Sequence, residues 1–299
     1  MNWTCGWDGG GTKTRVLCLS EDGRVLAEET FGPLNLNGSD PERVRHTVQD
    51  AVRFMACVEG GACKGLVIGA AGVSNASAVK LLTESAREAG YDGALRAVGD
   101  QEAALAGAIE GPGAVLIAGT GAICCGRGAN GESARVGGYG YLIDDAGSGY
   151  AIGRDILVAV VRAADGRDEP TCLTQAVLDA LHADGVSGII TWLYGAGTTK
   201  KEVAALAPLL LDALNHGDPA AERIADSASR ALAELAETAW RTLRLREGEL
   251  ALTGSILEHY PRIRDGVARR LGEACPAMRV IAPRHSAAYG AALLAREIG

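Results

Sequence analysis

The sequence predicts an α/β protein built from two duplicated domains. Two glycine-rich turns, Asp8–Thr14 and Gly119–Gly121, each adjoin a run that is typical of a β-strand. The order of expected strands and helices then restarts near residue 113. Glycine has no Cβ, so such turns let backbone amides approach a phosphate closely. Two of them in similar settings predict a nucleotide cleft between the two halves, which makes ATP chemistry the leading interpretation.

The first half is expected to follow the order β-β-β-α-β-α-β-α. Strands at residues 5–8, 15–19 and 25–30, with a turn at Asp22-Gly23, have the spacing of an antiparallel meander. Ser39-Asp40-Pro41-Glu42 has the capping-box pattern, and apolar residues then recur at helical spacing until Gly60-Gly61. The other expected elements are a strand at 65–70, a helix at 76–89, a strand at 95–98 and a helix at 102–109.

The second half repeats this pattern with a helical insertion. Strands are expected at 114–118, 122–126, 133–136, 250–253 and 278–281, and helices at 148–164, 172–183, 201–215, 219–246, 260–273 and 286–298. We therefore expect an N-terminal domain at residues 1–110 and a C-terminal domain with the insertion at residues 111–285. The last helix, within residues 286–299, is expected to pack back on the first domain.

Composition narrows the class of protein. The 299 residues are 47% apolar and carry a net charge of −8, which argues against nucleic-acid or anionic-membrane partners because both require a basic face. The eight cysteines include no Cys-x-x-Cys pair, which favours reduced thiols. The first residues lack the pattern of a signal peptide, and no apolar run reaches the ~18 residues of a membrane span. We expect a cytoplasmic protein.

The first glycine-rich turn combines a carboxylate with phosphate-binding residue types. Asp8 at a strand end is placed to hold Mg²⁺ through water, because Mg²⁺ prefers oxygen ligands and keeps much of its hydration. Thr12 and backbone amides can bind phosphate oxygens, and Lys13 either adds positive charge for ATP or points to solvent. The alternative is an ordinary hairpin turn. The chain has no Walker loop.

Two further segments follow expected strands and are candidates for nucleotide binding or catalysis. Gly119-Thr120-Gly121 does not complete Gly-x-Gly-x-x-Gly, which disfavours a dinucleotide-binding domain. Asp100 follows the expected strand at 95–98. It is either the N-cap of the next helix or a general base for a hydroxyl nucleophile.

The second half contains two other candidate binding segments. Asp145, with main-chain amides and the ring of Tyr139, is suited to holding a polyol, whereas the alternative is a glycine-rich turn with Tyr139 in the core. Gly254-Ser255 follows a strand, and small residues there would let an adenine ring lie against the backbone. The alternative for that segment is a plain strand-to-helix turn.

Taken together, these runs resemble the sugar kinase–Hsp70–actin superfamily. More closely, they are similar to its N-acetylglucosamine kinase-like branch, grouped with the BadF/BadG/BcrA/BcrD ATPase family. Further matching runs are Gly32-Pro33-Leu34-Asn35, Gly69-Ala70-Ala71-Gly72 and Arg284–Ala292. The resemblance covers essentially the whole chain, and it implies two ribonuclease H-like (actin-like ATPase) domains.

The resemblance also implies roles position by position. Asp100 stands where the family has its catalytic base. The positions that match amino-sugar ligands are Asn35, Thr120, Gly138, Tyr139 and Asp145. The positions that match the phosphate loops are Gly10, Gly11, Thr12 and Gly121, and those that match the adenosine loop are Gly254 and Ser255. Tyr139 stands where a close relative would show Trp and Ala146 where it would show Glu, so the exact sugar stays open.

The expected function is therefore ATP- and Mg²⁺-dependent phosphorylation of N-acetylglucosamine or a related amino sugar, at the 6-hydroxyl group. The nearest alternatives are kinases of glucosamine, N-acetylmuramic acid or glucose. Two others are an ATPase that activates a 2-hydroxyacyl-CoA dehydratase through a cysteine-bound iron–sulfur cluster, and a non-catalytic sugar sensor. Homodimers are common among relatives of this kind, and the sequence leaves the oligomeric state open.

Overall fold

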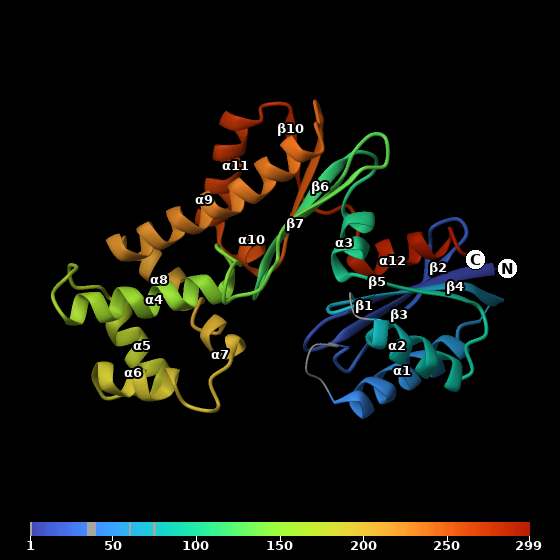
Figure 1. Cartoon of the computed structure of the whole chain (residues 1–299), viewed down its shortest axis with the longest axis horizontal. Helices are drawn as coiled ribbons and strands as arrows, with labels where there is room; N and C mark the ends of the chain where they lie inside the picture. Colours follow the sequence, from blue (N-terminus) through green and yellow to red (C-terminus); the bar gives the residue numbers. More distant parts are fainter. Residues whose placement is uncertain (1, 35–39, 60, 74–75) are drawn as a thin grey trace. The chain divides into compact units, whose positions relative to one another are not determined.

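The chain folds into two compact units (Figure 1). The computed structural model describes residues 2–34, 40–59, 61–73 and 76–299. Unit 1 comprises Met1–Glu110 and Pro283–Gly299, and unit 2 comprises Gly111–Ala282. Each unit contains a five-stranded mixed sheet with helices packed on it. Within the described residues, no helix combines the length and apolar character needed to cross a membrane.

The sheet of unit 1 has the strand order β3-β2-β1-β4-β5. Its strands are β1 (Asn2–Gly9), β2 (Thr14–Ser20), β3 (Val25–Phe31), β4 (Ala62–Ala70) and β5 (Ala94–Val98). The first three are antiparallel, which confirms the predicted meander, whereas β1, β4 and β5 run parallel. The carboxyl ends of these three parallel strands therefore meet at one edge of the sheet.

Helices cover both faces of this sheet (Figure 1). They are α1 (Pro41–Ala56), α2 (Ala76–Glu88), α3 (Asp100–Ala108) and α12 (Ala287–Ala295). Successive side chains of β4 point to opposite faces of the sheet, so the core has two parts. Leu66 and Ile68 pack with α1 and α2, while Val67 packs with α3 and α12.

The start and end of α1 differ from the predicted ones. Its N-cap is Asp40, whose carboxylate accepts a hydrogen bond from the Glu42 amide at 3.0 Å, and Pro41 takes the first helical position. The predicted capping box begins at Ser39, which lies outside the described residues, as does Gly60 at the predicted end. The helix already ends at Ala56.

The last helix, α12, packs on β1 and α3 of unit 1 at very close range. A Cβ built on Gly6 of β1 would stand 2.1 Å from the Ala288 carbonyl oxygen, and one on Gly290 would stand 2.2 Å from the Ala103 carbonyl oxygen. Glycine is therefore required at both positions. The Thr4 hydroxyl also donates to the Ala292 carbonyl at 2.9 Å.

Unit 2 repeats the strand arrangement of unit 1. Its strand order is β10-β9-β6-β7-β8. Strands β6, β7 and β8 form an antiparallel meander, and β9 and β10 run parallel to β6. Its strands are β6 (Gly113–Ala118), β7 (Ala122–Arg127), β8 (Ser133–Gly137), β9 (Gly248–Thr253) and β10 (Met278–Ile281). The two sheets thus have the same topology, which confirms the predicted duplication.

The helical part of unit 2 differs from the prediction in two places. Its helices are α4 (Gly149–Ala164), α5 (Leu173–Leu181), α6 (Gly185–Leu193), α7 (Lys200–Ala204), α8 (Leu209–Asn215), α9 (Pro219–Thr242), α10 (Ser255–His259) and α11 (Pro261–Ala274). The single helix predicted at 201–215 is wrong: Pro208 lacks an amide hydrogen and separates α7 from α8. Helix α6 was not expected, because Gly185 and Gly188 weaken its helical pattern.

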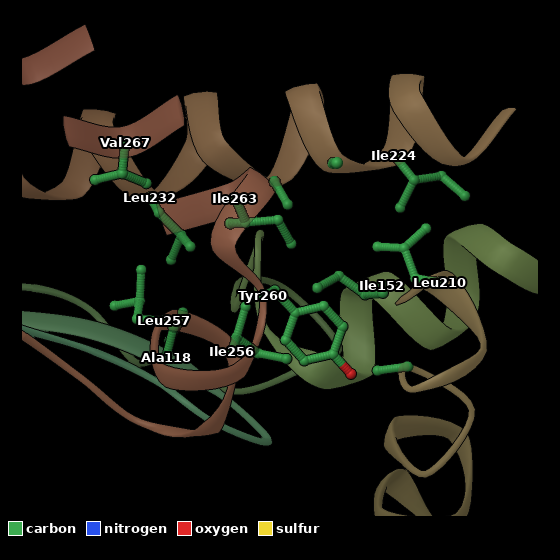
Figure 2. Packing of buried hydrophobic residues seen from close by; sticks show 14 of the residues in the cluster. Ala118, Ile152, Leu210, Ile224, Leu232, Ile256, Leu257, Tyr260, Ile263 and Val267 are labelled. Carbon is green, nitrogen blue, oxygen red and sulfur yellow. The ribbon is translucent and has the colours of Figure 1, made fainter. Parts of the chain in front are cut away.

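One large core holds unit 2 together (Figure 2). Leu232 of α9 and Ile263 of α11 belong to this cluster together with Ile256 of α10, and Ile152 of α4 lies near Leu210 of α8. This core fixes the segment 204–211 against α10 and the turn after β6, where a cavity opens.

Candidate active site

Two carboxylates lie at the same edge of the sheet in unit 1. In the parallel register Asp8 of β1 is opposite Gly69 of β4, and Gly69 is opposite Val98 of β5, two residues before Asp100. A Cβ on Gly69 would stand 2.8 Å from the Ala103 Cβ and 3.9 Å from the Asp100 Cα, so only glycine lets α3 begin here.

Asp100 is the first residue of α3 and not its cap. Gly99 occupies the N-cap position, so the N-cap alternative for Asp100 is wrong. The Asp100 carboxylate accepts a hydrogen bond from the Gln101 amide at 3.0 Å and remains half-buried. A carboxylate in the first turn is favoured by the helix dipole.

The electrostatics of Asp8 depend on this neighbour. Burial, and after it the negative charge of Asp100, raises the pKa of the Asp8 carboxyl group, while Arg15 and Lys13 act in the opposite direction. A divalent cation would relieve the repulsion between the two carboxylates. Mg²⁺ is commonly held by one or two carboxylates together with phosphate and water oxygens, so these residues fit the ion.

The first glycine-rich turn, Gly10–Lys13, is closed across its base. The Gly10 amide donates to the Lys13 carbonyl at 2.9 Å, and the Leu34 amide donates to the Gly10 carbonyl at 3.0 Å. Gly11, Thr12 and Lys13 form an exposed tip. The Gly10 amide is therefore used within the turn.

The second glycine-rich turn, at residues 119–121 in unit 2, is tied to the start of α4. The Gly119 amide donates to the Gly121 carbonyl at 2.9 Å, and the Gly149 amide donates to the Gly119 carbonyl at 2.7 Å. The Tyr150 amide donates to the Thr120 carbonyl at 3.3 Å. These bonds fix the turn to a helix of 16 residues.

Asp145 lies against this second turn. Its Oδ1 accepts a hydrogen bond from the Ala122 amide at 3.2 Å, and a Cβ on Gly121 would stand 2.9 Å from its Oδ2. The side chain is buried, and burial, followed by the charge of Asp144, raises its pKa. Its backbone has a left-handed φ of 63°, which is uncommon for a residue other than glycine. The structure thus brings Asp145 and Gly121 together.

The predicted sugar-binding residues Gly138 and Tyr139 lie in the loop that follows β8. Gly138 has a φ of 75°, and the Tyr139 amide donates to Asp144 Oδ2 at 3.2 Å. The Tyr139 side chain is 65% exposed, so the alternative that places it in the core is wrong. Asn35, the remaining predicted sugar ligand, lies outside the described residues.

A cavity of about 370 Å³ in unit 2 joins the second turn to the segment after β9. Thr120 and Ser255 both line it. Gly254 beside them has a φ of 96°, and a Cβ there would stand 2.4 Å from the Ala118 carbonyl oxygen, so the strand-to-helix turn requires glycine. A larger cavity of about 490 Å³ lies in unit 1 at the opposite end of β1, near Trp3, and contains none of the predicted residues.

Sequence reasoning missed most of the wall of the unit 2 cavity. The additional lining residues are Gly119, Gly149, Ala204, Ala205, Ala207, Pro208, Leu211, Ile256, His259 and Tyr260. The signal that could have indicated them is Pro208, which cannot continue a helix and follows the alanines Ala204, Ala205 and Ala207.

The two adjacent cysteines weighed for an iron–sulfur cluster are both buried in β7. Cys124 is fully buried, and burial raises its pKa well above the ordinary thiol value. Among the residues that the structure describes, no group of three or more His, Cys, Asp or Glu side chains is arranged to hold a metal ion.

Comparison with known proteins identifies the family. The family model described as "BadF/BadG/BcrA/BcrD ATPase family" matches residues 5–295. The chain belongs to the BadF/BadG/BcrA/BcrD ATPase family. It is 34% identical to an N-acetylmuramic acid/N-acetylglucosamine kinase of Clostridium acetobutylicum, covering 99% of each chain. It is also 29% identical to an N-acetyl-D-glucosamine kinase of Dictyostelium discoideum, covering 97% of this chain and 96% of the relative.

Two solved structures share the fold. A protein of Chromobacterium violaceum, provisionally named an N-acetylglucosamine kinase, superposes with a TM-score of 0.77 at 28% identity over 98% of each chain. A glucokinase of Streptomyces griseus, solved with glucose and an ATP analogue, superposes with a TM-score of 0.62 at 20% identity over 99% of each chain. The second likeness concerns the fold alone.

Proposed function

We propose that this protein is an ATP-dependent kinase that phosphorylates N-acetylglucosamine or a closely related amino sugar at its 6-hydroxyl group, with Asp100 as the general base. The observation that carries this proposal is the pairing of Asp8 and Asp100 at one edge of the unit 1 sheet. The names of the two curated relatives support the class of substrate.

Asp100 takes the proton from the attacking hydroxyl. A carboxylate can do this because the hydroxyl loses its proton as the bond to phosphorus forms, and a general base contributes about 10²–10⁴-fold to the rate. The position of Asp100 at the first residue of α3 fixes its backbone, and Gly69 lets α3 begin close to β4. Positioning and charge neutralisation supply most of the remaining catalysis.

ATP is held by three short segments. Gly254 and Ser255 border the 370 Å³ cavity, whose alanine- and proline-rich wall suits an adenine ring. Gly121 in the second turn, and Gly10, Gly11, Thr12 and Lys13 in the first, form the phosphate loops. Asp8 would hold Mg²⁺, which would supply positive charge beside the phosphates.

The amino sugar is bound by Asn35, Thr120, Gly138, Tyr139 and Asp145. Tyr139 presents an exposed ring against which a pyranose can pack. Asp145 has one oxygen engaged with the Ala122 amide, and a carboxylate is a strong acceptor for sugar hydroxyl groups. Thr120 lies in the second turn and lines the cavity.

Product analysis tests the proposal. The protein is incubated with ATP, Mg²⁺ and N-acetylglucosamine, and the product is examined by two-dimensional ¹H–³¹P NMR. Coupling of phosphorus to the two protons on carbon 6 is the expected result. Coupling to the proton on carbon 1 or carbon 3 would contradict the 6-hydroxyl assignment. If N-acetylglucosamine and N-acetylmuramic acid both remained unmodified while ATP was hydrolysed, the kinase itself would be contradicted.

A further inference from the structure

We propose that Arg135 favours amino sugars that carry a carboxylate substituent, such as the lactyl ether of N-acetylmuramic acid, over neutral amino sugars. This inference rests on the proposed function, because it assigns a substrate preference to the same sugar site. Arg135 is therefore a specificity-determining residue and has no part in proton or phosphoryl transfer.

Arg135 is held next to two of the proposed sugar-binding residues. It lies on β8, and its guanidinium donates to the Gly138 carbonyl at 2.7 Å. The guanidinium carbon also lies 5.1 Å from the centre of the Tyr139 ring. Such a cation–π contact and the hydrogen bond restrict the side chain before any ligand arrives. A guanidinium has five N–H donors, so one bond to Gly138 leaves capacity for a bidentate carboxylate contact.

The charge of Arg135 matters because the loop beside it is acidic. Asp144 accepts a hydrogen bond from the Tyr139 amide, and Asp145 follows it directly. These two carboxylates would repel an anionic substituent on the sugar. The positive charge of Lys200 is directed at Asp145, where it partly offsets the rise in the pKa of the carboxyl group that burial causes. Arg135 instead contacts Gly138 and Tyr139. A sugar carboxylate would therefore be attracted toward Arg135 and away from the two aspartates.

The loop also leaves room for a substituent on the sugar ring. The side chains of Tyr139, Leu142 and Ile143 are 65%, 80% and 84% exposed, which is unusual for three large apolar residues in one short loop. A lactyl ether combines a methyl group with a carboxylate, and it can contact this apolar surface and Arg135 together. A neutral amino sugar could pack its ring on Tyr139 but would present no carboxylate to Arg135.

The test compares kcat/KM for N-acetylmuramic acid and for N-acetylglucosamine in the wild type, Arg135→Gln and Arg135→Lys. A charge-assisted hydrogen bond contributes enough binding for an effect of about 10- to 100-fold. We expect Arg135→Gln to lower kcat/KM for N-acetylmuramic acid by that factor and to change the value for N-acetylglucosamine by less than about threefold. Arg135→Lys should restore part of the loss, because it keeps the charge without the bidentate geometry.

Arg127→Gln is the matched control. Arg127 also donates to a backbone carbonyl, that of Gly111, but it pairs with Ser133 at the far end of the same two strands. The Arg127→Gln substitution should leave the ratio of kcat/KM for N-acetylmuramic acid to kcat/KM for N-acetylglucosamine unchanged. A ratio that stays constant in Arg135→Gln, or an equal loss on both sugars, would overturn the inference alone. A wild-type protein that phosphorylates neither sugar would overturn the proposed function and the inference with it.

Discussion

Asp8 and Asp100 lie at the same edge of the unit 1 sheet, and the negative charge of Asp100 adds to burial in raising the pKa of Asp8. Two carboxylates near one another disfavour their own ionised forms unless a cation is present. This arrangement is costly for folding, and it fits the proposed binding of Mg²⁺ with ATP. It provides the basis for the first two predictions.

Asp100→Asn should lower kcat by about 10²–10⁴-fold while the affinity for ATP changes little, because the amide cannot accept the hydroxyl proton. Steady-state kinetics and equilibrium binding of ATP measure the two quantities separately. Asp92→Asn is the control, since Asp92 is an exposed aspartate of the same unit before β5. Near-normal turnover by Asp100→Asn would remove Asp100 from the base role.

Asp8→Asn should increase the free energy of unfolding of the metal-free protein at pH 7. A carboxyl group whose pKa is raised on folding binds more protons when folded, so wild-type stability falls as pH rises from the ordinary value of 3.8 through the raised one. Asparagine does not ionise, so the stability of Asp8→Asn does not fall with pH for this reason. Urea unfolding in EDTA at several pH values should show an advantage that is largest above the raised pKa and absent below pH 3.8.

The same variant should need more Mg²⁺ for activity. An Asp8→Asn protein that is no more stable than the wild type at pH 7, or whose advantage grows toward acid pH, would contradict the described environment of Asp8. A Mg²⁺ requirement equal to that of the wild type would separately contradict its proposed role as a metal ligand.

Two glycines beside the unit 2 cavity should respond differently to alanine. A Cβ on Gly119 meets no atom within 4 Å, so Gly119→Ala should fold with an unchanged Tm and yet raise the KM for ATP, because Gly119 lines the cavity. A Cβ on Gly254 would meet the Ala118 backbone at 2.4 Å, so Gly254→Ala should lower stability as well, by about 1–3 kcal/mol.

Thermal unfolding and ATP kinetics distinguish these outcomes. Gly197→Ala is the control, since a Cβ there also meets no atom within 4 Å and the residue lies in the loop between α6 and α7. An unchanged KM for ATP in Gly119→Ala would argue against the cavity as the nucleotide pocket. A Gly254→Ala protein as stable as the control would show that the turn tolerates a side chain.

The cysteines should divide by burial in their reaction with maleimide. Cys57 and Cys172 are exposed and should be labelled in the native protein, with the rate at Cys172 rising as pH increases because desolvation and Asp218 raise its pKa. Cys5, Cys18, Cys124 and Cys125 are buried and should react only after unfolding. Peptide mapping by mass spectrometry gives the labelled positions. Native labelling of Cys124 would contradict the packing of β7.

Much of the fold could be predicted from local sequence signals. The spacing of the three strand runs and the Asp22-Gly23 turn indicated the meander, and small residues such as Gly6 and Gly290 are explained by the close packing of α12. The break at Pro208 was missed because apolar residues on both sides continue the helical period.

The candidate site was harder to predict than the fold. Asp8 and Asp100 could be placed at strand ends, and parallel pairing brings such ends together. The contact of Asp145 with Ala122 depends on a left-handed backbone conformation, which the sequence does not display. The cavity wall at Ala204 and Pro208 comes from the insertion, and it is fixed by packing between distant segments.

The most direct test of the central claim is a coupled assay of ADP release with ATP and Mg²⁺ against N-acetylglucosamine, N-acetylmuramic acid, glucosamine, N-acetylmannosamine and glucose. The account predicts strong sugar-dependent ADP release with at least one N-acetylated amino sugar and little with glucose. ADP release that is the same with and without every sugar would contradict the claim that this protein is an amino-sugar kinase.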